Sequence, residues 1–238
     1  MGHLLFVTGT DTGAGKTLLT SLLALHLRQT GRHALAMKPF CTGGWEDVQL
    51  LGMALAKELA PDEINPFHFP DPVAPLIAAR RQRRPVQLQA AVSRIQAIAA
   101  RCQHLLIEGA GGLLVPLGKG YTVADLITRL QCPVVVAARN RLGVVNHALL
   151  TLAELRRRRV GSARIVLMNG PSSSLATRTN AALIAEFSQT RVLTVPYLGP
   201  KCSSLSVLNA QVKKLKKTLA AIVRMDTVTA PFRGGERD

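Results

Sequence analysis

Short apolar runs alternate along this chain with longer stretches of helical character. Short apolar runs bounded by polar residues are typical of buried strands, and longer periodic stretches are typical of helices. The predicted strands span residues 3–8, 33–37, 104–108, 133–138, 164–168 and 192–195. The predicted helices span residues 16–29, 47–59, 87–101, 123–130, 145–158, 176–188 and 209–224.

Several of the predicted strands are continuous apolar runs, such as Val134-Val135-Val136-Ala137-Ala138. Such runs are typical of a parallel sheet that helices cover on both faces. No repeat or low-complexity linker divides the chain, so we predict a single doubly wound α/β domain with a mostly parallel sheet over residues 1–225. Residues 61–86, rich in Pro and Arg, are predicted to be an excursion between helices, and residues 226–238 a frayed tail.

A glycine-rich loop joins the first predicted strand to the first predicted helix, with the sequence Gly9-Thr10-Asp11-Thr12-Gly13-Ala14-Gly15-Lys16-Thr17. Strand, loop, Gly-Lys-Thr and helix is the order of a phosphate-binding P-loop, which makes the predicted fold of the P-loop NTPase type. Backbone N–H groups surround the phosphates, Lys16 reaches the β- and γ-phosphates, and the Thr17 hydroxyl binds Mg²⁺. The alternative is a glycine turn with a chance Gly-Lys-Thr. Five residues separate Gly9 from Gly15-Lys16, one more than in the common pattern.

The composition is that of a globular protein with an aliphatic core, since 47% of the 238 residues are hydrophobic and only 4% are aromatic. No apolar run approaches the roughly 20 residues that span a bilayer. No basic segment precedes an apolar stretch at the N-terminus, as a secretory signal requires. The four cysteines lack metal-ligand or redox spacing, which predicts reduced thiols in a cytoplasmic protein.

The net charge is +16, and much of the excess lies in three basic clusters, residues 80–84, 156–159 and 213–217. Such clusters can bind nucleic acid through its phosphates. They have no interleaved aromatic residues and match no recognition motif. The second and third fall within or at the end of predicted helices, where a solvated face or a favourable C-terminal charge accounts for them. Specific nucleic-acid binding is therefore not expected.

Polar or glycine-rich residues follow four of the predicted strands. Ligands of open parallel sheets bind beyond the carboxyl ends of the strands, so these residues and the P-loop predict one composite site. Lys38 is suited to neutralise charge on a transferred phosphoryl group, unless it is an ordinary surface lysine. Glu108, followed by Gly109-Ala110-Gly111-Gly112, is suited to hold Mg²⁺, unless N–H groups of the glycine turn satisfy it.

Three further positions each have a functional and a structural interpretation. Asp47 begins a predicted helix, where a capping role is the ordinary one. Residues 142–147 begin another predicted helix. Its free N–H groups bind a substrate carboxylate, unless the segment is an ordinary glycine turn before a helix. His147 is assigned no catalytic role. Asn169 reads a nucleotide base with its amide or closes a turn.

The sequence resembles the dethiobiotin synthetases of biotin biosynthesis over most of residues 4–198. The matching stretches are Val7–Thr12 with Gly15-Lys16-Thr17, Lys38-Pro39, Glu108–Leu117, Ala124–Ile127, Pro133–Val136 with Arg139, and Leu142–His147. The longer spacing within the P-loop is that family's own form, so it supports the resemblance.

The resemblance implies a homodimer that joins CO₂ to 7,8-diaminononanoate with ATP and Mg²⁺. One amine of the substrate captures CO₂ as a carbamate, whose oxygen attacks the γ-phosphate. The second amine closes the ring of the resulting carbamic–phosphoric anhydride and expels phosphate. The implied partners are therefore small molecules and a second copy of the chain, with no membrane.

The resemblance also assigns roles to residues of this chain. Catalysis falls to Lys38, Lys16 and Thr12. The nucleotide is held by Thr12, Gly13, Ala14, Gly15, Lys16, Thr17, Leu18, Asn169 and Pro196. The metal is held by Thr17, Asp47 and Glu108. The substrate is held by Thr42, Gly143, Val144, Val145 and Asn146, the last four contributed by the partner subunit.

This chain departs from the family pattern at three places. Thr42 stands where the family often has Ser, and Leu76 stands where a histidine is frequent. The connection from Lys38 to Asp47 is short. Thr42 retains the hydroxyl and adds a methyl group, and Leu76 changes the wall of the substrate site. The short connection bears on the metal role assigned to Asp47.

The alternative function is a ParA/MinD-like ATPase switch that binds nucleic acid or membrane through basic patches. Such switches carry an additional lysine, in a Lys-Gly-Gly arrangement, near the start of the P-loop. This chain has Thr10-Asp11-Thr12 there, which argues against the switch. A related amidoligase is a third possibility, although nothing indicates a glutaminase partner domain.

Overall fold

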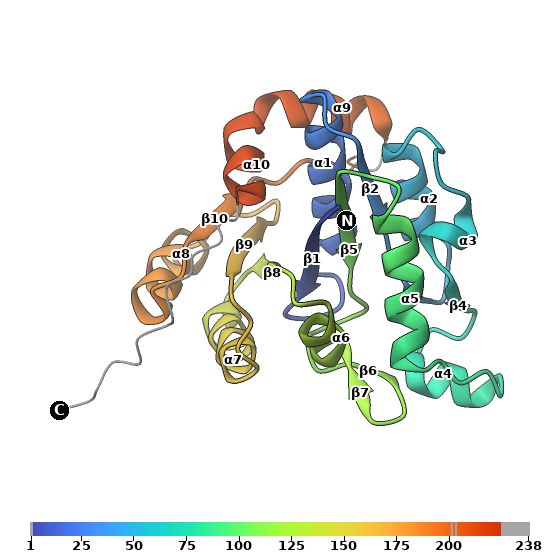
Figure 1. Ribbon diagram of the computed structural model, residues 1–238. Helices are drawn as coiled ribbons and strands as arrows, with labels where there is room; N and C mark the ends of the chain where they lie inside the picture. The colour runs from blue at the N-terminus through green and yellow to red at the C-terminus, as the bar shows by residue number, and fades with distance from the viewer. Residues whose placement is uncertain (1, 201, 203, 225–238) are drawn as a thin grey trace.

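A computed structural model describes residues 2–200, 202 and 204–224. Its centre is a six-stranded parallel sheet with the strand order β10-β9-β8-β1-β5-β2, seen in Figure 1. The strands are β1 (His3–Gly9), β2 (Ala34–Met37), β5 (His104–Glu108), β8 (Val134–Asn140), β9 (Ala163–Asn169) and β10 (Val192–Val195). Each of the six predicted strands is present.

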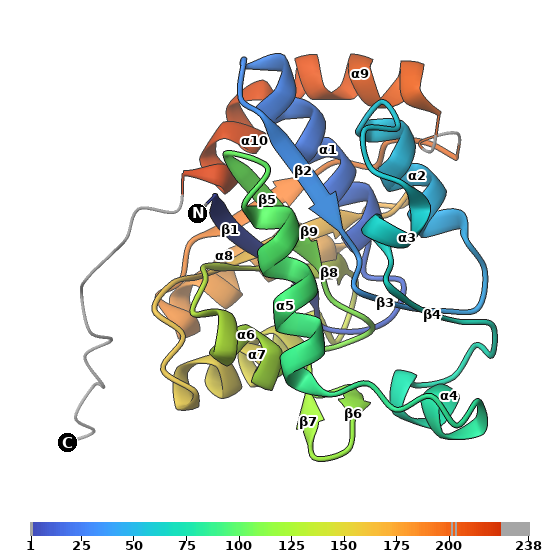
Figure 2. The same ribbon diagram turned by 45° about the vertical axis from the view of Figure 1, so that its right-hand side comes forward.

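Helices cover both faces of the sheet, as Figures 1 and 2 show. One face carries α1 (Lys16–Gln29), α2 (Glu46–Ala54), α9 (Leu205–Lys214) and α10 (Lys216–Val223). The other carries α5 (Leu88–Ala99), α6 (Val123–Leu130), α7 (Val144–Arg157) and α8 (Leu175–Ser188). The chain moves one way from β1 to β2 and the opposite way from β2 to β10, so right-handed crossovers place α1 on one face and α5, α6, α7 and α8 on the other. The predicted doubly wound fold is confirmed.

The core lies on both sides of the central strands. Phe6 and Val7 in β1 and the run Val134–Ala138 in β8 are fully buried. The continuous apolar run thus marks a strand with both faces covered, as predicted. The buried core residues are mostly Leu, Val, Ile and Ala, in keeping with the low aromatic content.

Two predicted helices have an end that lies more than two residues from the observed one. The helix expected over 47–59 ends at Ala54, because Ala56 and Lys57 have positive φ angles of 53° and 60°, which a right-handed helix does not accommodate. The helix expected over 209–224 begins earlier and is divided at Leu215 into α9 and α10.

The excursion over residues 61–86 contains short elements that were not predicted. They are α3 (Pro61–Ile64), β4 (Phe67–Phe69) and α4 (Pro75–Arg81). Strand β4 pairs in parallel with β3 (Phe40–Thr42), just beyond the end of β2. A second small pair joins β6 (Pro116–Gly118) to β7 (Tyr121–Thr122).

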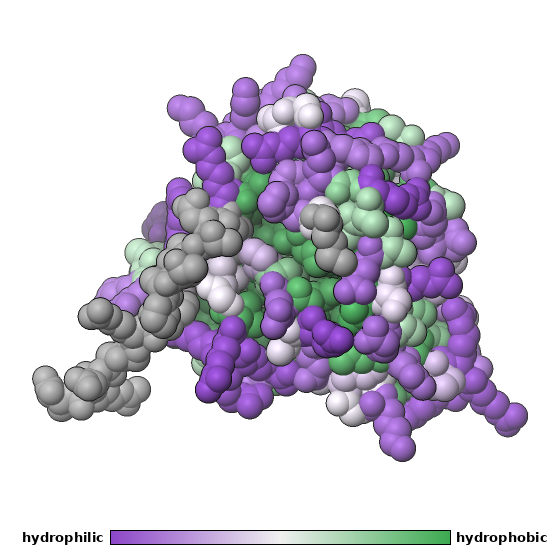
Figure 3. All heavy atoms as spheres, in the orientation of Figure 1, coloured by the Kyte–Doolittle hydropathy of each residue, from purple (hydrophilic) through white to green (hydrophobic). Residues whose placement is uncertain are grey.

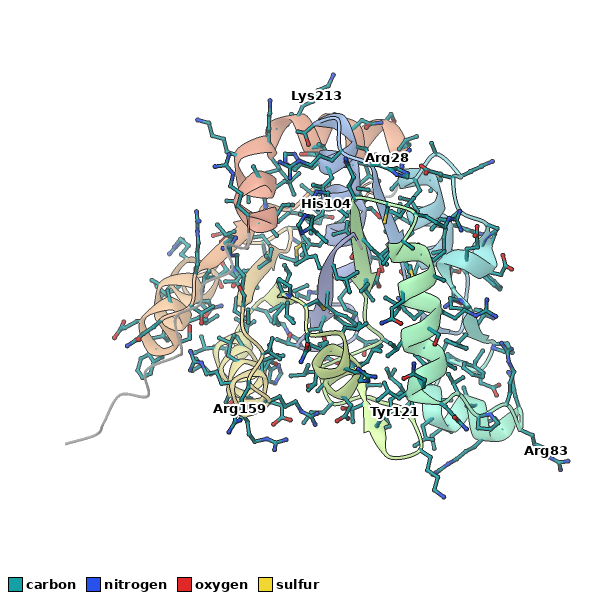
Figure 4. The ribbon with its side chains drawn as sticks, viewed as in Figure 1. Arg28, Arg83, His104, Tyr121, Arg159 and Lys213 are labelled. Carbon is teal, nitrogen blue, oxygen red and sulfur yellow. The ribbon has the colours of Figure 1, made fainter. Side chains whose placement is uncertain are left out.

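The basic clusters lie apart on the surface. Figure 4 shows Arg83, Arg159 and Lys213, one from each cluster, at separate corners of the molecule. In the second cluster, Arg158 forms ion pairs with Glu154 at 2.5 Å and Asp125 at 2.6 Å. On the face drawn in Figure 3, hydrophilic residues are spread along the periphery rather than gathered into a single field.

The four cysteines are free thiols. Within residues 2–200, 202 and 204–224, no helix is long and apolar enough to cross a bilayer. The predicted tail over 226–238 lies outside the described residues.

Candidate active site

The P-loop follows β1 at the carboxyl edge of the sheet and leads into α1. Gly15 precedes the helix with φ 88°, a conformation that favours glycine, and a Cβ built there would lie 3.1 Å from the side chain of Met168. No side chain caps the first turn of α1. Its N–H groups are therefore open to an anion such as a phosphate.

Lys16 lies in the first turn of α1 and is only 6% exposed. Its Nζ donates a hydrogen bond to the Asp11 carbonyl oxygen at 3.0 Å. Burial lowers the pKa of Lys16, an effect that the Glu108 carboxylate opposes and the Lys38 ammonium reinforces. An anionic ligand at this position favours the charged form and offsets the cost of burial.

Lys38 and Glu108 form a buried ion pair at the ends of β2 and β5. Lys38 Nζ lies 2.8 Å from Glu108 Oε1 and also pairs with Asp47 Oδ2. Lys38 is 7% exposed and Glu108 is 1% exposed. Parallel pairing of β2 with β5, and of β5 with β1, brings these residues beside the P-loop from far apart in the sequence.

The charges in this cluster support one another. Burial alone would lower the pKa of Lys38, but the carboxylates of Glu108 and Asp47 raise it well above its usual range. Burial alone would raise the pKa of Asp47, but the Lys38 ammonium holds it below its usual value. Both groups are therefore charged at neutral pH. Asp47 is the second residue of α2, which Trp45 precedes as the N-cap, so the capping interpretation of Asp47 is wrong.

Glu108 has two carboxylate oxygens in different environments. Oε1 accepts hydrogen bonds from Thr17 Oγ1 at 2.8 Å and from Lys38 Nζ. Oε2 is buried and has no hydrogen-bond partner among the described residues. Leaving a buried carboxylate oxygen unpaired is costly, so this atom fits a ligand that arrives with the substrates.

The oxygens of Thr17, Asp47 and Glu108 are the donor type that Mg²⁺ prefers. Over the described ranges, no group of three or more His, Cys, Asp or Glu side chains that could hold a metal was found. Asp47 and Glu108 are two carboxylates, and Mg²⁺ commonly binds one or two carboxylates together with substrate phosphates. The residues present therefore fit Mg²⁺.

Asn65, which sequence reasoning missed, fixes the backbone around Lys38. It is 2% exposed, and its Nδ2 donates to the Lys38 carbonyl oxygen at 2.6 Å and to the Pro39 carbonyl oxygen at 3.3 Å. The Lys38 N–H also donates to the Ile64 carbonyl oxygen at 2.8 Å. Asn65 belongs to the irregular excursion, where no periodicity points to a buried polar residue.

The start of α7 and the P-loop line the same small hollow. Gly143 is the N-cap of α7, and no side chain caps its first turn. A hollow of about 200 Å³ separates this start from the P-loop, lined by Thr10, Asp11, Thr12, Ala14, Arg139, Arg141, Val144 and His147. Thr12 itself donates its N–H to Asp11 Oδ1 at 2.7 Å.

Thr42 ends β3 and is half-buried, and Leu76 lies in the first turn of α4. Trp45 belongs to the short connection between Lys38 and Asp47. Its ring stacks on that of His68, with ring centroids 3.9 Å apart.

Asn169 and Pro196 follow the neighbouring strands β9 and β10. Met168 packs against Gly15, which brings the end of β9 to the P-loop. The Oδ1 of Asn169 accepts a hydrogen bond from Asn140 Nδ2 at 2.8 Å. Pro196 is exposed.

Comparisons with known proteins give one consistent family. A family model described as an AAA domain matches residues 3–200. The chain is 40% identical over 219 residues to the ATP-dependent dethiobiotin synthetase BioD of Anaeromyxobacter dehalogenans, covering 88% of this chain and 98% of that protein. It is 36% identical over 210 residues to the protein of the same name from Bacillus subtilis, covering 84% and 88%.

Among solved structures, the MinC:MinD cell division protein complex of Aquifex aeolicus is similar with a TM-score of 0.60, at 12% identity, covering 93% of this chain and 95% of that one. A ParA family ATPase from Chlorobium tepidum is similar with a TM-score of 0.55, at 10% identity, covering 95% of each chain. At this level of identity the likeness shows a shared fold and nothing further.

Proposed function

Because this chain belongs to the ATP-dependent dethiobiotin synthetases and is thus an ATP-dependent ligase, we propose that its reaction takes place at the cluster formed by the P-loop, Lys38 and Glu108. The observation that carries this proposal is the environment of Glu108. One of its oxygens is held by Thr17 and Lys38, while the other is buried and unpartnered. The substrates are CO₂, 7,8-diaminononanoate and ATP.

In the proposed reaction, the carbamate of the diamine attacks the γ-phosphate, and the second amine then closes the ring and expels phosphate. Both steps gather negative charge, so the site has to position the reactants and neutralise that charge. The open N–H groups of α1 and the buried Lys16 ammonium hold the phosphates. The Lys38 ammonium, kept charged by its two carboxylate partners, neutralises the reacting groups, and Thr12 donates a hydrogen bond to them.

Thr17, Asp47 and Glu108 would hold Mg²⁺, which supplies charge neutralisation between the phosphates when bound. The buried Oε2 of Glu108 supports this assignment. The half-exposed Asp47 carboxylate, kept ionised beside Lys38, supplies a second oxygen.

We assign the diamine to Thr42 and to the start of α7, residues Gly143, Val144, Val145 and Asn146, contributed by the partner subunit of a homodimer. Exposed apolar side chains support this dimer: Leu142, Leu150 and Leu114 are 85%, 62% and 55% exposed. Leu114 and Leu150 line a groove between the loop after β5 and α7. Leu142 directly precedes Gly143, the N-cap of α7. Contiguous exposed apolar surface commonly marks a protein interface.

The remaining assignments concern the nucleotide base and the setting of the enzyme. We assign the base to Asn169 and Pro196, since the end of β9 lies against the P-loop. The enzyme is proposed to be cytoplasmic, with residues 1–225 acting as one domain. Specific nucleic-acid binding is not proposed, because the basic clusters are separated and Arg158 is engaged in ion pairs.

The experiment that tests the proposal is an assay of the purified chain with 7,8-diaminononanoate, bicarbonate, Mg²⁺ and ATP, with dethiobiotin as the measured product. We expect product and phosphate to form together and only when the diamine is present. ATP hydrolysis that ignores the diamine but rises with DNA would contradict the proposal and favour the switch.

A further inference from the structure

Three asparagine side chains form a hydrogen-bonded chain beside the P-loop. Asn140 and Asn169 are register partners at the carboxyl ends of β8 and β9, and Asn180 faces them from α8. Asn140 Nδ2 donates to Asn169 Oδ1 at 2.8 Å, and Asn180 Nδ2 donates to Asn140 Oδ1 at 2.8 Å. Asn140 and Asn180 are each 5% exposed. Two buried amides therefore support the one that reaches the site.

Backbone carbonyl oxygens fix which end of each buried asparagine amide donates hydrogen bonds. Asn140 Nδ2 also donates to the Thr177 carbonyl oxygen at 2.8 Å, and Asn180 Nδ2 also donates to the Arg141 carbonyl oxygen at 3.1 Å. A carbonyl oxygen only accepts, so reversing either amide would set oxygen against oxygen. Asn140 must therefore present its nitrogen to Asn169.

The orientation of the Asn169 amide is fixed as a result. Its Oδ1 is turned toward Asn140, so its Nδ2 is turned away, and within the described ranges that nitrogen has no hydrogen-bond partner. A carbonyl oxygen has two lone pairs, so Oδ1 keeps one acceptor position. Asn169 thus offers one donor and one acceptor in a fixed order.

A donor beside an acceptor matches one kind of base edge. The carboxamide of Asn pairs with the N7 acceptor and the N6 amino donor of adenine, whereas a 6-oxo purine presents two acceptors. Resting on the proposed role of Asn169 at the base, we propose that Asn140, held by Asn180, is a positioning residue that fixes the Asn169 amide and so gives the site its preference for 6-amino purines over 6-oxo purines.

The test compares ATP with ITP, which has an oxygen in place of the 6-amino group. In the dethiobiotin assay, Asn140→Ala and Asn180→Ala are expected to raise the KM for ATP about three- to tenfold, as the loss of one hydrogen bond predicts. The KM for ITP, the KM for the diamine, and kcat at saturating ATP are expected to stay unchanged. Asn140→Ala removes the hydrogen bond to Asn169, and Asn180→Ala removes the hydrogen bond that holds Asn140. Either variant therefore tests the inference if the other fails to fold.

Ser188→Ala is the matched control. Ser188 is also a buried polar residue of α8, and its Oγ donates to the Ile184 carbonyl oxygen at 2.6 Å. This variant is expected to lower the melting temperature without changing the ratio of the KM values for ATP and ITP. That ratio therefore separates positioning of Asn169 from a general loosening of α8.

An equal rise in the KM values for ATP and ITP, or an unchanged KM for ATP in a folded variant, would overturn the inference. Asn169→Ala separates this failure from failure of the underlying role. If Asn169→Ala leaves the KM for ATP unchanged, the proposed base contact is wrong. If it raises that KM while Asn140→Ala and Asn180→Ala do not, only the positioning role is wrong.

Discussion

Replacement of Lys38 by methionine is expected to destabilise the folded protein as well as to stop turnover. Lys38 and Glu108 are both buried, with a 2.8 Å contact between Nζ and Oε1. Removing the ammonium leaves the carboxylate buried with Thr17 as its remaining hydrogen-bond donor. Breaking a buried ion pair from one side costs about 3–5 kcal/mol, since the remaining charge is uncompensated. For a chain of this size the melting temperature is expected to fall by about 6–20 °C.

The double variant Lys38→Met/Glu108→Gln separates this effect from loss of packing. Glutamine has the shape of glutamate and can still accept the Thr17 hydroxyl, but it carries no charge. We expect the double variant to recover about 2–3 kcal/mol of the free energy of unfolding relative to Lys38→Met, while neither variant makes dethiobiotin.

Urea unfolding of the wild type, the two single variants and the double variant measures this coupling. A coupling free energy below about 0.5 kcal/mol would refute the reasoning, because the charges of Lys38 and Glu108 would then be independent. Equal denaturant dependence across the four proteins is the control that the denatured states are comparable.

Three further predictions follow from the same geometry. Gly15→Ala is expected to lower the free energy of unfolding by about 1–3 kcal/mol and to abolish nucleotide binding, because φ is 88° and the new Cβ would lie 3.1 Å from the Met168 side chain. Urea unfolding measures the first effect, and calorimetric titration with ATP measures the second. Asp47 has a pKa below its ordinary value of 3.8, so its contribution to stability is present above that pH and is lost as the pH falls through the lower folded value. Unfolding free energies between pH 5 and pH 2 are therefore expected to fall less steeply for Asp47→Asn than for the wild type, and identical slopes would show that Lys38 does not stabilise the Asp47 carboxylate. Leu150→Glu is expected to convert the proposed homodimer to monomers with loss of turnover; analytical ultracentrifugation measures the mass, and an unchanged dimer would exclude this face of α7 from the interface.

The sheet could be predicted because its signal is local. Val134–Ala138 is a short, valine-rich apolar run of the kind typical of a strand covered on both faces, and it is fully buried. Strands β3 and β4 are three residues each and escape a periodicity argument, because each depends on the other for its hydrogen bonds. The division between α9 and α10 likewise has no proline or glycine to mark it.

The grouping of side chains at the candidate site was predictable only where a polar residue directly follows a strand. Lys38 and Glu108 occupy such positions, and the parallel register brings them together. The roles of Asn65 and Asn140 were not predicted, because a buried amide is recognised only from the carbonyl oxygens to which it donates hydrogen bonds. Those carbonyls lie far away in the sequence: Asn65 bonds Lys38 and Asn140 bonds Thr177.

The pairing of Lys38 with Glu108 explains how the site can exist before its substrates arrive. A lone buried carboxylate would oppose folding, but the ammonium compensates its charge. The compensation uses Oε1 and leaves Oε2 without a partner among the described residues. A hydrogen bond to Oε2 would stabilise the resting protein and remove the atom that the proposed metal requires. The unpaired Oε2 thus lowers the stability of the folded protein, which is expected where a fold keeps a ligand position open.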